Sequence, residues 1–396
     1  MTRLRWTTTA ACALTVLAAS AAVPASSADP SSSASSPSWT RTIPALTVET
    51  VASGLDIPWD IAWIDSTRFL VTERPGRLWL GSTEPGVTLQ RVSAGFADLN
   101  LLAPGGLLGL TVDPRFATNR IFYTCQTHKA PNDVRVIRWR LSADRRSAVR
   151  VGAPVIAGIP FQHSHFGCRL LIMPDGRMLV GTGDGALPKA PQARDNLAGK
   201  ILRVGLDGSV PKDNPWATST GKRRFVWNYG HRNVQGLALR PGTNQVFNAE
   251  HGPDRDDEIN LVLKGRNYGW NPVDPSGSGT YYQSVPMTDL VKYPNAVRAA
   301  WSSGFPTVAT SGLGFVTGPA WGEYAGAAFV AELKGSGVMA LTLDAAGAVV
   351  ASAQVPELDD AYGRIRTVQQ APDGALYVLT SNGGRADVIL RVTPVA

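Results

Sequence analysis

Short runs of alternating or continuous apolar residues, bounded by Gly, Pro, Asn and Asp, recur along most of the 396-residue chain. Runs with the period of an amphipathic helix are scarce. Apolar residues at every second position are typical of half-buried strands, and Gly- and Pro-rich breaks are typical of the turns between strands. The pattern therefore predicts an all-β protein.

One unit of this pattern, a turn signal followed by a strand, repeats along the chain. The copies lie at 65–73, 113–123, 174–180, 241–247 and 372–378, with a degenerate copy at 318–330. They start roughly 48 to 77 residues apart, which suits four-stranded units with loop insertions. This spacing predicts a six-bladed β-propeller with four-stranded antiparallel blades, in which function lies at the mouth of a central channel. A pair of β-sandwiches would lack a repeat sustained over the whole chain.

The N-terminus has the composition of an export signal. Arg3 and Arg5 precede an apolar stretch at 10–23 and small residues at 25–28. This order is typical of a secretory signal peptide, and the stretch is short for a membrane-spanning helix. We therefore expect a secreted protein without stable membrane insertion. The predicted organisation is a signal peptide at 1–28, a Ser/Pro/Ala linker at 29–42 and a propeller domain at 43–396.

Composition excludes two classes of protein. A hydrophobic share of 44% is enough to form a large core, so the chain is not a disordered one. The formal net charge is +7, but the densest basic cluster is only Lys222-Arg223-Arg224. A nucleic-acid partner is therefore not expected.

Two cysteines, Cys125 and Cys168, remain after the signal peptide, both in segments that read as strands. In an oxidising compartment they could form a disulfide. The alternative is two separate buried thiols, because the sequence does not give the Cα separation that a bridge needs. No Cys spacing typical of a metal site is present.

The first chemical candidate is a pair of histidines, His163 and His165. On a strand they would share one face and could ligate Zn²⁺, but no third ligand of suitable spacing follows. A single His at a channel mouth serves equally well as a general base, and Asp184 after the next strand could orient it. The alternative for each His is a core or surface role.

A second candidate is the polar segment 226–270. Arg232 and Asn233 form a fork that could clamp a carboxylate or a quinone oxygen, unless the arginine serves as an inter-blade salt bridge. The carboxylate-rich stretch at 250–258 could bind Ca²⁺ through oxygen ligands, or be a solvated acidic loop.

Further cations complete the candidate site. Arg364 and Arg366 are predicted on one strand face, and Lys334 follows the strand of the degenerate repeat. Cations aimed at one mouth would suit a ligand with several carboxylates, although each alone could be a surface charge.

Together these segments resemble the soluble pyrroloquinoline quinone (PQQ) dependent sugar dehydrogenases, the glucose/sorbosone dehydrogenase family that includes aldose dehydrogenases. The likeness extends from about residue 54 to 380. Its most specific pieces are Gly105-Gly-Leu-Leu-Gly-Leu, His165 with Arg169 and Asp184, Tyr229-Gly-His-Arg-Asn, Glu250-His-Gly-Pro, Asp257-Glu-Ile-Asn, Asn267-Tyr-Gly-Trp and Gly363-Arg-Ile-Arg.

The resemblance implies a six-bladed propeller and assigns roles to these residues. His165 would be the general base for the sugar C1 hydroxyl, with Asp184 orienting it and Arg232 as a further catalytic candidate. The residues implied to bind PQQ are Arg232, Asn233, Lys334, Arg364 and Arg366, with Ser311 on a looser match. The carbonyls of Gly252 and Pro253 would bind the Ca²⁺ that polarises PQQ, whereas Glu258 and the Tyr268 carbonyl would belong to a second, structural Ca²⁺ site.

Some positions depart from the family pattern. Pro104 stands where an acidic or amide residue usually helps to form the sugar pocket, and proline has no side-chain hydrogen-bonding group. Thr367 replaces a common Asp, Cys168 replaces a usual Gly, and Ser164 precedes the implied base. The implied cofactor contacts are unaffected, whereas the sugar preference is open.

The resemblance thus implies an exported PQQ- and Ca²⁺-dependent enzyme that oxidises an aldose to its lactone and passes electrons to an external quinone, dye or cytochrome-like acceptor, as a monomer or homodimer. Two alternatives remain open. One is a non-enzymatic propeller that binds a glycan or protein, because fold alone does not determine function. The other is a Ca²⁺-dependent lactonase-type hydrolase. In each case the loops at 129–133, 186–194 and 276–297 are expected to select the ligand.

Overall fold

The computed structural model describes residues 44–84, 86–102 and 104–395. The predicted signal peptide (1–28) and linker (29–42) lie outside these residues. The described chain is mostly strand, which confirms the prediction of an all-β protein. Within residues 44–395 as described, none of the helices has the length and apolar character needed to cross a bilayer.

Three four-stranded antiparallel sheets follow one another along the middle of the chain. The first contains β11 (Gly167–Ile172), β12 (Arg177–Thr182), β13 (Lys200–Gly205) and β14 (Val226–Tyr229). The second contains β15 (Val234–Leu239), β16 (Val246–Glu250), β17 (Glu258–Leu261) and β18 (Trp301–Ser302). The third contains β19 (Thr310–Phe315), β20 (Ala328–Glu332), β21 (Val338–Leu343) and β22 (Val349–Gln354).

A nine-stranded sheet near the N-terminus contains two more antiparallel units, joined where β5 pairs in parallel with β9. The first unit is β2 (Pro58–Trp63), β3 (Arg68–Glu73), β4 (Arg77–Ser82) and β5 (Gln90–Ala94). The second is β6 (Leu107–Val112), β7 (Ile121–His128), β8 (Asp133–Leu141) and β9 (Ser147–Arg150), with β10 (Ile156–Ile159) added on β8.

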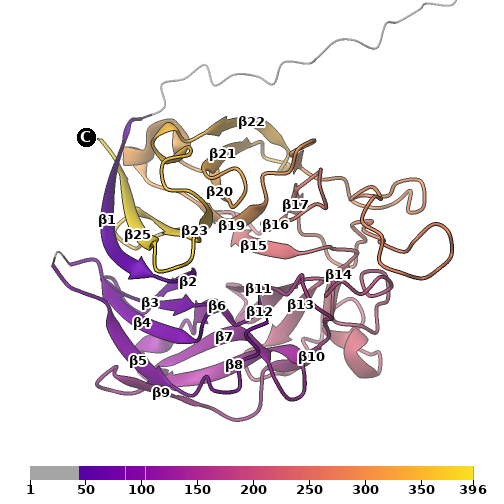
Figure 1. Ribbon diagram of the computed structural model, residues 1–396, viewed down its shortest axis with the longest axis horizontal. Coiled ribbons are helices and arrows are strands. Elements are labelled where there is room, and N and C mark those ends of the chain that lie inside the picture. Colours follow the sequence, from indigo (N-terminus) through magenta and orange to yellow (C-terminus); the bar gives the residue numbers. More distant parts are fainter. Residues whose placement is uncertain (1–43, 85, 103, 396) are drawn as a thin grey trace, which may run out of the picture. The chain divides into compact units, whose positions relative to one another are not determined.

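The last sheet joins the two ends of the described chain. Its order is β1 (Leu46–Leu55), β25 (Asp387–Pro394), β24 (Leu376–Thr380) and β23 (Ile365–Gln370). In Figure 1 the indigo strand β1 lies along the yellow strand β25, in an antiparallel register that runs from Leu46 opposite Pro394 to Leu55 opposite Asp387. The short helices are α1 (Phe116–Asn119) and the 3-10 helices η1 (Gly221–Phe225), η2 (Pro319–Tyr324) and η3 (Pro356–Leu358).

The first strands of these units contact one another in a closed cycle. Strand β2 contacts β6 and β23, β11 contacts β6 and β15, and β19 contacts β15 and β23. Each sequence repeat falls on the strand beside one of them, namely β3, β7, β12, β16, β20 and β24. Four-stranded antiparallel units around a common centre are consistent with the predicted β-propeller.

The core lies between neighbouring sheets. Every residue of β7 and of β13 is buried, because these strands are covered on both faces. One apolar cluster, for example, joins Val136 of β8 with Val180 of β12. The apolar runs read from the sequence are therefore the layers that hold the units together.

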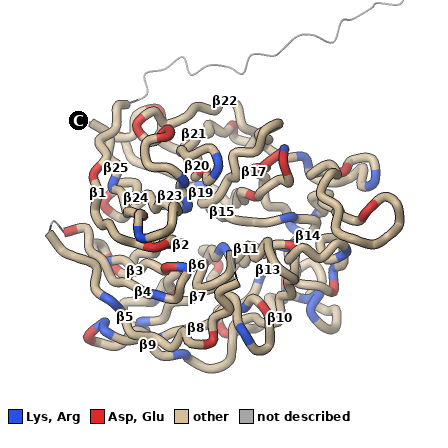
Figure 2. Tube along the Cα trace, viewed as in Figure 1, with Lys and Arg blue, Asp and Glu red and all other residues tan. Residues whose placement is uncertain are grey.

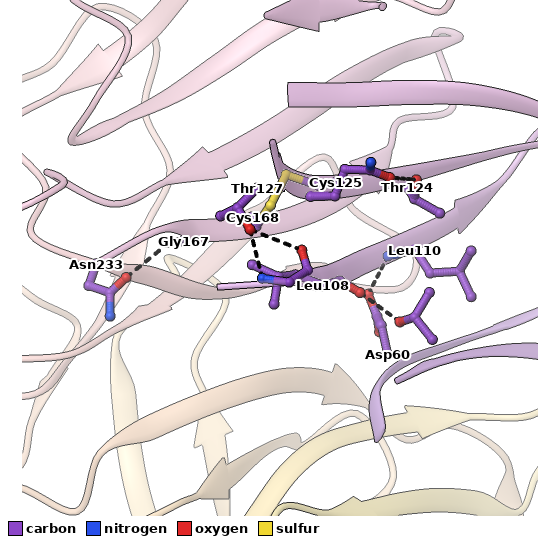
Figure 3. Close-up of a disulfide and its surroundings, with 12 residues drawn as sticks. Asp60, Leu108, Leu110, Thr124, Cys125, Thr127, Gly167, Cys168 and Asn233 are labelled. Atoms are coloured by element: carbon purple, nitrogen blue, oxygen red, sulfur yellow. Dashed lines mark hydrogen bonds between the residues drawn. A yellow bond between two sulfur atoms is a disulfide. The ribbon is translucent and has the colours of Figure 1, made fainter. Parts of the chain in front are cut away.

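Cys125 in β7 and Cys168 in β11 form a disulfide, so the alternative of two separate thiols is wrong (Figure 3). Both cysteines are fully buried. The bridge connects two successive units three residues after His165, which gives the departure from Gly at position 168 a structural role.

Replacing both Cys125 and Cys168 with Ala is expected to lower the free energy of unfolding by about 2 to 4 kcal/mol, because the bridge restricts the unfolded chain. The two cysteines are 43 residues apart. The measurement is the urea midpoint of the oxidised parent against the double variant, with dithiothreitol-treated parent as a second comparison. Equal unfolding free energies for parent and variant would contradict the expectation.

Candidate active site

The structure places His165 in the loop directly before β11, with the left-handed backbone angle φ of 55°. This conformation brings its carbonyl against Gly183, where an added Cβ would lie 1.8 Å from the oxygen. The prediction that His163 and His165 share a strand face is wrong, because the strand begins only at Gly167. His163 is exposed, whereas the His165 side chain is mostly buried. The two imidazole rings therefore do not lie together on one strand face as a pair of metal ligands.

His165 and Asp184 come together as the sequence predicts. Nδ1 of His165 lies 2.8 Å from Oδ1 of Asp184, which also accepts the Ala186 amide at 2.9 Å. Oδ2 of Asp184 accepts the Trp270 indole N–H at 2.7 Å and the Tyr281 hydroxyl at 2.7 Å. The carboxylate thus has four donors in a fully buried position.

These contacts set the charge of both groups. Burial by itself raises the pKa of Asp184, but the hydrogen bonds from His165 and Tyr281 outweigh it and leave the pKa lowered. Burial lowers the pKa of His165, with an opposing contribution from Asp184. The arrangement therefore favours an ionised carboxylate next to a neutral imidazole, the protonation state that a general base requires.

Arg232 lies beside this pair. Its backbone N–H donates to Glu250 at 2.9 Å, and its guanidinium donates to the His251 carbonyl at 3.1 Å and to the Gln283 side chain. The guanidinium carbon is 5.6 Å from the centre of the Trp270 ring, which in turn binds Asp184. Nε of Arg232 is buried without a hydrogen-bond partner among the described residues.

Asn233 has a supporting contact rather than a free side chain. Its Oδ1 accepts the Gly167 amide at 3.1 Å and the Gln235 side chain at 3.1 Å. Because Gly167 starts the strand that follows His165, Asn233 fixes the backbone next to the candidate base (Figure 3).

Arg366 of β23 is the second candidate arginine, and its side chain is also held by hydrogen bonds. Arg366 donates to Gln235 at 3.0 Å and to Ser311 at 3.3 Å, and its Nε is also buried without a described partner. Burial, followed by the charge of Arg169, lowers the pKa of Arg366 to about 9. Arg364 directly precedes the strand and is exposed. Basic residues are visible near the labels β19, β20 and β23 in Figure 2.

Arg169 has a structural role that the sequence did not indicate. It pairs with Asp60 of β2 at 2.6 Å and also donates to the Gln235 carbonyl of β15 at 2.7 Å and to Thr367 of β23 at 3.1 Å. Asp60 accepts the Leu110 amide of β6 at 2.9 Å (Figure 3). The pair therefore ties five of the central strands together.

Lys334 lies by a different loop. It is exposed, and its Nζ is 3.4 Å from the Thr307 hydroxyl. The Thr307 amide donates to the Asp254 carbonyl, which places the lysine near the turn of Gly252 and Pro253. None of the interactions found in the described chain joins Lys334 to His165, Arg364 or Arg366.

The turn at Gly252 and Pro253 is held by Asp257. Oδ1 of Asp257 accepts the Gly252 amide at 2.8 Å, and its Oδ2 accepts the amides of Val308 and Ala309. Neither carbonyl of the turn accepts a hydrogen bond from a described residue.

Glu258 and Tyr268 lie in a separate buried network. Glu258 accepts the Thr288 hydroxyl at 2.8 Å and the Asn260 amide at 3.2 Å, and burial next to Glu250 raises its pKa to about 8. The Tyr268 ring stacks 4.3 Å from His231. The described residues contain no group of three or more His, Cys, Asp or Glu side chains arranged for a metal ion.

Trp270 and Tyr281 are the site residues without an assigned role in the sequence analysis. They contact Asp184 from 86 and 97 residues further along the chain. The available signals were weak: Trp270 ends one of the quoted motifs, and Tyr281 falls in the loop 276–297 that was expected to line the mouth.

Comparisons with known proteins identify the family of this chain. Residues 55–391 match the family model described as glucose/sorbosone dehydrogenase. The aldose sugar dehydrogenase YliI of Escherichia coli is 31% identical over 91% of this chain and 96% of its own. Quinoprotein glucose dehydrogenase B of Acinetobacter calcoaceticus is 30% identical over 72% of this chain and 63% of its own. The PQQ-bound structure of an aldose sugar dehydrogenase from Streptomyces coelicolor superposes with a TM-score of 0.72, at 29% identity over 89% of this chain and 99% of its own.

Proposed function

This chain belongs to the glucose/sorbosone dehydrogenase family and is a PQQ-dependent sugar oxidoreductase, and from that premise we propose that it is an exported, Ca²⁺-requiring aldose dehydrogenase. Its substrate is a sugar and its electrons pass to an external acceptor. The finer proposal rests on the His165–Asp184 pair together with Arg232 and Arg366, whose buried Nε–H groups have no hydrogen-bond partner among the described residues.

The N–H donors of this site fit a ligand that carries several carboxylates, and PQQ is such a ligand. Buried N–H groups without acceptors are costly, and the Nε groups of Arg232 and Arg366 both have this character. We therefore assign the carboxylates and quinone oxygens to Arg232, Asn233, Lys334, Arg364 and Arg366, with Ser311 supporting Arg366. When bound, PQQ supplies a two-electron acceptor for hydride.

Ca²⁺ fits the acceptor groups near this set. The carbonyls of Gly252 and Pro253 are free of described hydrogen bonds in a turn held by Asp257, and hard cations prefer such oxygen ligands. For the second site, Glu258 and the Tyr268 carbonyl are assigned to a structural Ca²⁺. Nearby, Oδ1 of Asn248 and Oδ1 of Asn260 are buried acceptors without a hydrogen-bond partner in the described part of the chain, and this surplus of oxygen supports a cation there.

The proposed chemistry assigns the proton to His165. Nε2 removes the proton of the sugar C1 hydroxyl while the C1 hydrogen leaves as hydride with its electron pair, so that the sugar becomes the lactone. Asp184 stabilises the imidazolium that forms, because its Oδ1 accepts from Nδ1. Arg232, stacked on Trp270, adds positive charge beside the reacting groups.

Two further parts of the proposal concern architecture and location. The closed cycle of contacts among β2, β6, β11, β15, β19 and β23 supports six blades over residues 43–396. The N-terminal pattern supports a signal peptide at 1–28 and a linker at 29–42, and hence export. Pro104 is exposed next to the Gly105–Gly106 turn and offers no side-chain hydrogen bond, so the sugar preference is expected to differ from that of relatives with a polar residue there.

The test is dye-linked oxidation of a panel of aldoses by purified apo-protein, with PQQ and Ca²⁺ omitted in turn, together with calorimetric titration of PQQ. Turnover that requires both additions supports the proposal and ranks the sugars. Absence of PQQ binding together with binding of a glycan or protein would overturn it in favour of a propeller that acts only as a binding scaffold.

Turnover is expected to fall in acid as His165 gains a proton. Burial lowers the pKa of His165 below its ordinary 6.5, so the neutral base persists to more acidic pH than a free imidazole. The acidic limb of kcat/KM should therefore have its midpoint below pH 6.5. The measurement is kcat/KM at saturating PQQ across this range. A limb centred well above that value would contradict the assignment of His165 as the base.

A further inference from the structure

A short segment of the long β17–β18 connection reaches into the candidate active site. Tyr281 donates its hydroxyl hydrogen to Asp184, and Gln283 accepts a hydrogen bond from the Arg232 guanidinium. Tyr282 between them points differently, since it is 41% exposed. The segment is anchored to its own loop by a bridge between Val273 and Tyr281 and by the Tyr282 amide. Tyr281 and Gln283, alternate residues of this segment, thus contact Asp184 and Arg232.

The Tyr281 hydroxyl is close to both His165 and Asp184. Its oxygen is 2.7 Å from Oδ2 of Asp184 and 3.2 Å from Nδ1 of His165. A phenol has one hydrogen, and an ionised carboxylate can only accept, so that hydrogen points to Asp184. The hydroxyl therefore presents a lone pair to Nδ1 of His165. Burial next to the Asp184 charge raises the pKa of Tyr281, which keeps the phenol protonated.

This arrangement determines which ring nitrogen of His165 carries the hydrogen. Oδ1 of Asp184 and the hydroxyl oxygen of Tyr281 both lie within reach of Nδ1, and both act as acceptors there. A hydrogen on Nδ1 satisfies them, whereas the opposite tautomer would place three lone pairs together. Nε2 is then left with its lone pair free to accept a proton.

We propose that Tyr281 is a positioning residue that holds His165 in the Nδ1–H tautomer through its shared contact with Asp184. The residue acts through Asp184 and His165 and has no contact of its own with the sugar in this proposal. The 276–297 loop thereby contributes to the orientation of the base as well as lining the mouth. The inference deepens the proposed function and rests on it for the reaction, but the tautomer itself is a property of the protein without cofactor.

The first readout is therefore made on the apo-protein. Side-chain ¹⁵N chemical shifts of His165, assigned by comparison with His165→Asn, report both the tautomer and the pKa. The parent is expected to show Nδ1–H with an unprotonated Nε2. Tyr281→Phe is expected to show a mixture with Nε2–H and a pKa raised toward the ordinary value, as water replaces the hydroxyl. Tyr282→Phe is the matched control and should leave both unchanged.

The second readout is turnover with PQQ and Ca²⁺. Tyr281→Phe is expected to lower kcat by roughly 10-fold to 100-fold with KM for the sugar little changed, because orientation of the base is lost while sugar contacts remain. The acidic limb of the pH profile should move upward with the pKa of His165.

The outcomes separate this inference from the proposed function. A parent protein with the Nε2–H tautomer, or a Tyr281→Phe variant with the parental tautomer and pKa, overturns the positioning role. If Tyr281→Phe does not fold, the tautomer of the parent protein is the deciding observation. The Nδ1–H form supports the positioning role, and the Nε2–H form rejects it. The expected tautomer and its loss in Tyr281→Phe, without turnover of any sugar by the parent, would support the positioning role and reject the dehydrogenase.

Discussion

Replacing His165 with Asn is expected to lower kcat by about 10²- to 10⁴-fold, the usual contribution of a general base. Asn is similar in size to part of the imidazole and keeps a polar contact to Asp184, but it cannot accept the proton of the C1 hydroxyl. The measurement is kcat with PQQ and Ca²⁺ at saturating sugar. Binding of PQQ should persist, because the arginine donors are unchanged.

His163→Asn is the matched control for this variant. His163 is exposed two residues away in the same loop, so its replacement tests the loss of an imidazole without the loss of the Asp184 contact. We expect parental kcat from His163→Asn. Full turnover by His165→Asn with reconstituted cofactor would reject the mechanism as written.

Replacing Arg169 with Met is expected to lower the free energy of unfolding by about 3 to 5 kcal/mol, because it leaves a buried carboxylate without its partner. Arg169 is 5% exposed and Asp60 is 3% exposed, and the ion pair joins β11 to β2. The arginine also donates to β15 and β23, so these contacts are lost as well. The measurement is the urea unfolding curve at neutral pH.

Two controls distinguish a buried pair from charge loss in general. Arg68→Met removes the cation from a half-exposed pair with Asp65, for which about 0 to 1 kcal/mol is expected. The double variant of Arg169→Met with Asp60→Leu removes both buried charges and should recover much of the loss. A single Arg169→Met variant as stable as Arg68→Met would show that the pair does not stabilise the central strands.

Much of the architecture could be predicted because strand signals are local. The turn signals at 174–176 and 372–374 directly precede β12 and β24, as expected from their Gly and Pro residues. Apolar runs report burial on both faces, and their repetition along the chain indicates stacked units. The strand expected through His163 and His165 is wrong, because the backbone has a positive φ at His165, the His165 carbonyl packs against Gly183, and the strand begins only at Gly167. The contact with Gly183 joins residues 18 apart, so it has no signature in the local pattern.

By itself, the sequence determined the all-β class, the repeated unit and the identity of the chemical groups, since these depend on residue type and spacing. The His165 and Asp184 contact was within its reach because both residues flank successive strands. Only the tertiary structure decided the disulfide, the Arg169 pair and the position of Tyr281 against Asp184, 97 residues away. Each of these three contacts joins residues from different sheets or from a distant loop. Which of these segments meet is determined by how the sheets pack against one another, and a run of neighbouring residues does not contain that information.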